Sequence, residues 1–145
     1  MIRRDDLKKL LLIFAVTLAA LGMVACTNGE TMVLLDERIT AVKVAESKGF
    51  GGMNEEILRS FEDKQSIKLF ERAITSAVEQ PGKVDISNPE YDIMVEYDGA
   101  PTHALHLWLG DEGQRSTFMY LNDEVVYLTS KEVTGKLRVL ILEGE

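Results

Sequence analysis

The fold of this chain is decided by residues 91–128, which read YDIMVEYDGAPTHALHLWLGDEGQRSTFMYLNDEVVYL. Apolar and polar residues alternate in four short segments of this stretch, and such alternation is typical of strands with one buried face. Turn-forming residues separate the segments, and short connections between successive strands predict an antiparallel meander. The four predicted strands are residues 91–97, 103–109, 116–121 and 124–128.

Two amphipathic helices are predicted to pack against this sheet. Residues 64–78 follow Asp63, a favourable N-cap, and carry apolar side chains at steps of three and four. Residues 131–142 repeat this spacing after Thr129 or Ser130, either of which can cap a helix. Each helix therefore presents one apolar stripe that the sheet can bury.

Two further strands are predicted before the first helix. Residues 39–46 alternate clearly, and residues 54–61 are interpreted as a strand, although their pattern also fits a helix. The resulting order is ββαββββα. We expect an α+β two-layer sandwich, with a mostly antiparallel sheet of about five to six strands and both helices on one face.

The N-terminal region has the layout of a secretory signal. Basic residues precede an apolar run over residues 10–25, and small residues lead to Cys26, the single cysteine. This pattern resembles a bacterial lipobox, in which the cysteine receives a diacylglyceryl group and becomes the mature N-terminus. We therefore predict a signal peptide at 1–25, a lipidated tether at 26–37 and a folded domain at 38–145.

An uncleaved transmembrane anchor is the alternative for this region. At about 1.5 Å per residue the apolar run would reach roughly 24 Å, which is short of the ~30 Å hydrocarbon core of a bilayer. We therefore favour the lipid anchor, which would hold the domain at the outer face of the cell membrane.

Composition limits the partners of the domain. The formal net charge is −8, and because the first 25 residues carry four basic and two acidic side chains, the remaining residues carry −10. This charge argues against nucleic acid as a partner and against electrostatic docking on anionic lipid. We expect the partners to be the membrane, through the lipid anchor, and an envelope protein, peptide or glycan.

An aromatic surface patch is the predicted binding site. If Leu105, Leu107 and Leu109 face the helices, the residues between them face the other way, where a two-layer sandwich leaves the sheet uncovered. The alternative is a reversed strand phase, in which the tryptophan is part of the core. The expected patch consists of His106, Trp108, Phe118 and Tyr120.

No catalytic or metal-binding motif is recognisable. His103 and His106 are three residues apart, so they lie on opposite faces of a strand and cannot share an ion. Asp92 and Glu96 share a face but are ~13 Å apart, beyond the roughly 5 to 9.5 Å of a glycosidase pair. We expect no metal, no cofactor and no catalytic residues.

Three segments carry a resemblance to a known family: SFEDKQSIKLFERAI at 60–74, PGKVDISNPEYDIMVEY at 81–97 and HLWL at 106–109. They resemble the YhfM-like family of small lipoproteins from Bacillus-type bacteria. The resemblance implies a Gram-positive host and a lipid anchor, and no activity or site residue comes with it. We expect a non-catalytic binding domain at the cell surface. The alternatives are an envelope hydrolase and an accessory or inhibitor module that acts on a membrane protein.

Overall fold

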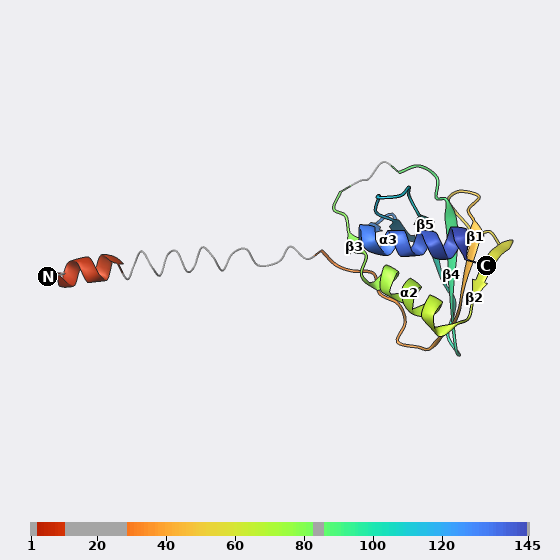
Figure 1. Cartoon of the computed structure of the whole chain (residues 1–145), viewed down its shortest axis with the longest axis horizontal. Helices are drawn as coiled ribbons and strands as arrows, with labels where there is room; N and C mark the ends of the chain where they lie inside the picture. Colours follow the sequence, from red (N-terminus) through yellow and green to blue (C-terminus); the bar gives the residue numbers. More distant parts are fainter. Residues whose placement is uncertain (1–2, 11–28, 83–85, 145) are drawn as a thin grey trace.

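A computed structural model describes residues 3–10, 29–82 and 86–144 of the chain (Figure 1). Residues 4–10 are helical, and the remaining elements form a folded α+β unit. These elements are β1 (Ile39–Glu46), β2 (Ile57–Phe61), α2 (Lys64–Thr75), β3 (Val78–Glu79), β4 (Tyr91–Tyr97), β5 (His103–Trp108), β6 (Thr117–Tyr120), β7 (Val126–Leu128), α3 (Lys131–Arg138) and a π-helical turn (Val139–Glu143).

Within the described residues the strands form one sheet in the order β2-β1-β4-β5-β6-β7-β3. All neighbouring strands are antiparallel, and β4 to β7 follow one another as the predicted meander. The α+β class, the antiparallel sheet and the two packed helices are therefore confirmed. The sheet has seven strands instead of five or six, because a short strand follows α2.

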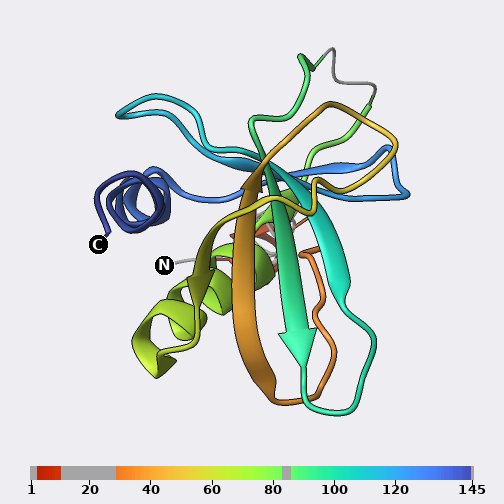
Figure 2. The ribbon, with the colours of Figure 1, turned by 90° about the vertical axis from the view of Figure 1, so that its right-hand side faces the viewer.

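Both helices pack on one face of the twisted sheet, here called the helix face (Figures 1 and 2). Phe70 and Ile74 of α2 and Leu137 of α3 are fully buried in a common core. The predicted inward orientation of Leu105, Leu107 and Leu109 is confirmed, because all three belong to this core. The opposite side of the sheet is called the outer face.

The first helix is shorter than predicted and the last one changes its geometry. Asp63 is the N-cap of α2, with its side chain accepting from the backbone N–H of Ser66 at 2.9 Å. The helix ends at Thr75, not at residue 78, because Val78 pairs with Leu128 at the edge of the sheet. Ser130 caps α3, which continues as the π-helical turn Val139–Glu143.

Residues 30–37 fall in the predicted tether, and Met32 and Leu34 contact the core on the helix face, as expected for the stretch from Met32 to Leu35. Met32 is 2% exposed and donates its backbone N–H to Ala77 O at 3.2 Å. The backbone of Val33 both donates to and accepts from Tyr120 Oη, at 2.7 and 2.8 Å. The packed part of the chain therefore begins before the predicted domain boundary at residue 38.

Candidate functional site

The four residues of the predicted patch do not lie together. The β5–β6 register places Phe118 opposite Leu107 and Tyr120 opposite Leu105, so both aromatic rings belong to the helix face. His106 and Trp108 are on the outer face, where Met119 and Thr117 are their cross-strand neighbours. The prediction of one patch is therefore wrong. The connection between β5 and β6 directs Phe118 and Tyr120 to the helix face, and Phe118 is fully buried there.

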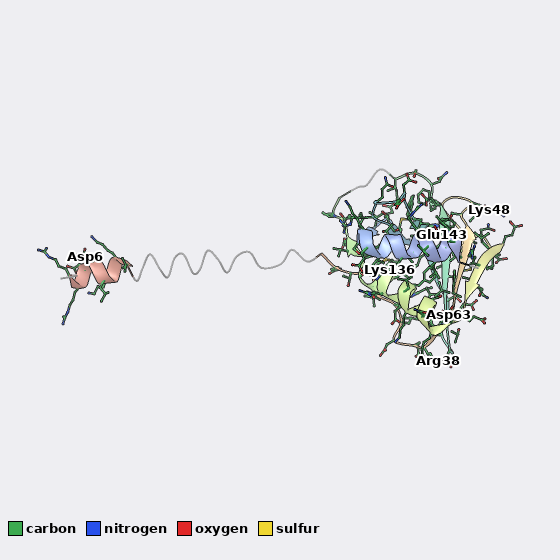
Figure 3. All side chains as sticks on the ribbon, viewed as in Figure 1. Asp6, Arg38, Lys48, Asp63, Lys136 and Glu143 are labelled. Carbon is green, nitrogen blue, oxygen red and sulfur yellow. The ribbon has the colours of Figure 1, made fainter. Side chains whose placement is uncertain are left out.

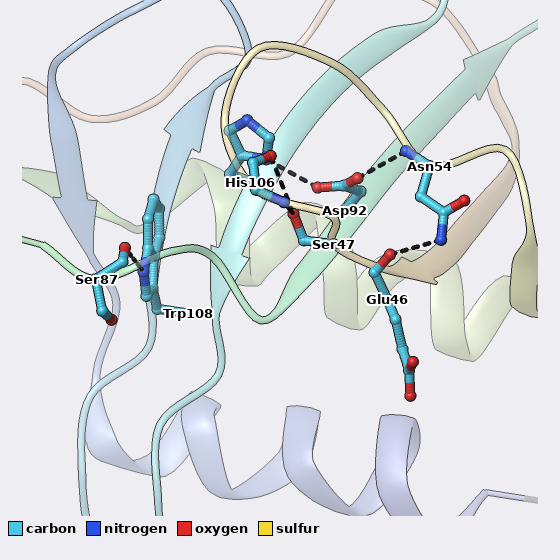
Figure 4. Close-up of polar contacts among 8 residues, drawn as sticks. Glu46, Ser47, Asn54, Ser87, Asp92, His106 and Trp108 are labelled. Atoms are coloured by element: carbon cyan, nitrogen blue, oxygen red, sulfur yellow. Dashed lines mark hydrogen bonds and ion pairs between the residues drawn. The ribbon is translucent and has the colours of Figure 1, made fainter.

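A buried polar cluster occupies the outer face instead. Asp92 and His106 are directly opposed on β4 and β5, both are 0% exposed, and Asp92 Oδ1 lies 2.8 Å from His106 Nδ1. Asp92 Oδ2 accepts the backbone N–H of Asn54 at 2.8 Å, and Asn54 Nδ2 donates to Glu46 O (Figure 4). Both carboxylate oxygens are therefore used. His106 Nε2 is buried and has no hydrogen-bond partner among the described residues.

The loop over residues 47–56 covers this cluster and arches above His106 (Figure 4). The Phe50 ring lies 5.8 Å from the His106 ring and 5.9 Å from Trp108, while 50% of its surface is exposed. Trp108 Nε1 donates to Ser87 O at 2.9 Å. Gly49 and Gly51 have positive φ angles of 108° and 93°, which glycine adopts without steric cost. The expectation of an uncovered outer face is therefore wrong at this end of the sheet.

The second histidine lies on the helix face, as its spacing from His106 predicts. His103 Nδ1 is 3.0 Å from Tyr97 Oη, and its ring packs edge-on against Tyr97 and Tyr120. Burial raises the pKa of Tyr97 above its usual value, and the N–H of Leu35 offsets part of that increase. In the described part of the chain, no group of three histidine, cysteine or acidic side chains could hold a metal ion.

A groove lies between α2 and α3 on the outside of the helix layer, with a volume of about 1120 Å³. Leu69, Val139 and Leu140 supply its apolar surface, and Val139 is 56% exposed. The charged rim includes Lys136, which Figure 3 shows on α3 beside α2. Lys136 Nζ is 3.1 Å from Glu132, and this hydrogen bond lowers the pKa of the Glu132 carboxyl. Lys68, Glu71 and Arg72 line the groove from α2.

A family model described as YhfM protein matches residues 43–143, which include the polar cluster and both helices of the groove. The chain belongs to the YhfM family. No curated protein matches it. A similar solved structure is that of a thioesterase-like protein from Clostridium sporogenes, with a TM-score of 0.56 and 16% identity. The match covers 76% of this chain and 98% of that one, and at this identity it shows a common fold alone.

The sequence interpretation missed the Asp92–His106 pair of this YhfM domain. The sequence did contain one signal, the loop at 98–102 that joins the two strands. If the β4–β5 hairpin is centred on residue 99, residues seven positions before and after it face each other, so position 92 lies opposite position 106. A two-residue turn at Asp98–Gly99 would give a different register. The covering loop and the unpartnered Nε2 have no signal in a single sequence.

The predicted lipidation site, Cys26, lies outside the described residues. Across residues 3–10, 29–82 and 86–144, no helix has both the length and the apolar character needed to cross a bilayer. The N-terminal anchor of this YhfM family member therefore stays a prediction.

Proposed function

We propose that the chain is a lipoprotein anchored through Cys26 at the outer face of a Gram-positive cell membrane, and that its domain binds an envelope protein without catalysing a reaction. The apolar run and single cysteine support the anchor, since two acyl chains attach a protein lastingly to a bilayer. The packed chain begins near Glu30, so the chain between Glu30 and Cys26 can span at most about 14 Å. The partner would therefore be close to the membrane surface.

The observation that carries the binding proposal is the groove between α2 and α3. It combines apolar side chains that are accessible to a partner with charged side chains on its rim, a combination that fits an amphipathic segment. The Asp92–His106 pair, in contrast, is sealed from solvent and serves the hydrogen bonds of the fold. An open groove and a closed polar pair favour binding over catalysis.

Charge indicates the chemistry of the partner. Lys136 is paired with Glu132, whereas Lys68 and Arg72 take part in no ion pair among the described residues. Within the described part of the chain, Lys68 and Arg72 are therefore unpaired cations in a domain that is otherwise acidic, since residues 26–145 carry a net charge of −10. We therefore expect the occupant to be an acidic amphipathic segment of an envelope protein, including a membrane protein that the domain modulates as an accessory or inhibitor module.

Site-specific crosslinking on intact cells tests the groove. A photoreactive amino acid at Val139 is expected to give one discrete crosslinked protein, and the same residue at Leu58, which is 53% exposed on β2 outside the groove, is expected to give none. The double charge reversal Lys68→Glu and Arg72→Glu should abolish the Val139 product. Lys131→Glu, an exposed position outside the groove, is the matched control. Equal products at Val139 and Leu58 would reject the groove as the binding site.

An envelope hydrolase is the second candidate, and one observation favours it. A histidine held by a carboxylate at Nδ1 and unpartnered at Nε2 has the arrangement of a general base. Phe50 would have to move to admit a substrate. Hydrolysis of a panel of esters and thioesters by the purified chain, lost in Asp92→Asn but kept in His103→Gln, would establish this function. If neither the unaltered chain nor the two variants hydrolyse any compound of the panel, the hydrolase candidate is rejected and the binding proposal stands.

A further inference from the structure

The buried Nε2 of His106 has no role in the proposed binding function. Asp92 Oδ1 accepts a hydrogen bond from His106 Nδ1–H, and with the proton of a neutral imidazole on Nδ1 the lone pair lies on Nε2. This nitrogen is fully buried and unpartnered in the described part of the chain. Metal-binding histidines are oriented in this way, with one ring nitrogen on a carboxylate and the other on the metal.

Two methionines neighbour His106 on the outer face of the sheet. Met119 is directly opposite His106 in the β5–β6 ladder and 4% exposed, and residues so opposed have Cβ atoms about 4.5 to 5.5 Å apart. Met94 occupies the diagonal position on β4, because it pairs with Ala104 on the outer face. Met53 is in the covering loop, next to the Asn54 N–H that binds Asp92. Nitrogen and thioether sulfur are thus the donor types available here.

We propose that His106 Nε2 and Met119 Sδ bind a soft monovalent cation, Cu(I), beneath the loop at 47–56. Soft sulfur ligands such as thioethers suit Cu(I), and imidazole suits copper as well. The single negative charge of Asp92 balances the single positive charge of the ion. The site uses one histidine, so it is compatible with the separation of His103 and His106 on opposite faces.

The cover provides a route to the site. Phe50 is half exposed, contacts both His106 and Trp108, and is flanked by glycines with positive φ. A displacement of this ring, together with the loop that carries it, would open a path to His106. The Trp108 ring, whose centroid is 6.3 Å from that of His106, belongs to the single tryptophan of the chain. Its fluorescence therefore reports on the proposed site.

An anaerobic Cu(I) titration of the full chain in detergent tests the proposal, with a chromophoric Cu(I) chelator as competitor. The Cys26→Ser background removes the single thiol as a competing ligand. We expect one equivalent of Cu(I) to be withdrawn from the chelator and Trp108 emission to be quenched in parallel. Zn²⁺ should leave the emission unchanged. No withdrawal, or equal responses to Zn²⁺ and Cu(I), would overturn the proposal.

Met119→Leu is the decisive variant, because it removes the sulfur and nearly conserves side-chain volume. We expect at least tenfold weaker Cu(I) binding with an unchanged melting temperature. Met32→Leu is the matched control, since Met32 is equally buried but lies in the core of the helix face. Unaltered affinity in Met119→Leu, or equal losses in both variants, would show that Met119 is not a ligand.

Discussion

At the scale of single residues, the fold depends on a carboxylate that is buried with all of its hydrogen-bond partners. Asp92 is 0% exposed, and its two oxygens accept from His106 Nδ1 and Asn54 N. A buried charge of this kind is tolerated because the surrounding donors replace water. The cluster joins β4, β5 and the covering loop, so its loss would affect three segments of the chain at once.

Asp92→Leu is expected to lower the free energy of unfolding by about 3 to 5 kcal/mol, because it leaves two buried donors without an acceptor. Asp92→Asn keeps an acceptor oxygen and should cost less than half as much. Urea unfolding followed by circular dichroism measures both values. A loss below about 0.5 kcal/mol in Asp92→Leu would contradict the structural role of the cluster.

Tyr97 predicts the response of the domain to alkaline pH. Burial raises the pKa of its phenol in the folded state above the usual value of 10.0, so the neutral form is favoured by folding. The corresponding stability is complete below about pH 10 and is lost as the pH rises through the folded pKa. In Tyr97→Phe, the free energy of unfolding should fall less steeply with pH above about pH 10. Urea midpoints measured from pH 8 to 11 would show it, and parallel curves for both proteins would refute it.

At the scale of elements, the spacing of apolar residues in the sequence predicted the helices and the meander. It did not predict the strand register or the short strand β3. The stripe on α2 and the alternation in β4 and β5 follow from burial on one side, which a sequence records directly. The two residues of β3 are too few to show a period. Which side chains of β6 point to the helix face depends on the length and geometry of the loop before it. This loop places Phe118 on the helix face, not on the outer face as expected.

The covering loop contains two glycines with positive φ, Gly49 and Gly51, and Gly51 gives the simpler test. Gly51 has a φ of 93° and open space around it, so Gly51→Ala adds backbone strain and no clash. We expect the closed conformation of the loop to become less stable by about 1 to 2 kcal/mol. Acrylamide should then quench Trp108 fluorescence more easily. Gly52→Ala, which has neither a positive φ nor a nearby atom, is the control and should leave quenching unchanged. Identical quenching in both variants would argue against the loop as the cover of Trp108.

At the scale of the whole molecule, the proposed attachment to a membrane depends on Cys26. Cys26→Ser is expected to release the chain from the membrane fraction if signal cleavage persists, and to leave residues 1–25 attached if lipidation is required for cleavage. Mass spectrometry of the unaltered mature chain should find a diacylglyceryl group on the sulfur. A bare thiol, or an intact N-terminal segment in the unaltered protein, would reject the lipid anchor.

The packed segment at 30–38 has a mechanical consequence for an anchored chain. Backbone bonds join Glu30 to Glu79 and Met32 to Ala77, and Tyr120 holds Val33 from both sides. A pull from the bilayer would therefore act on these bonds before it reached the central strands of the sheet. The domain and the segment from Glu30 to Arg38 would then turn together as one rigid body under such a load.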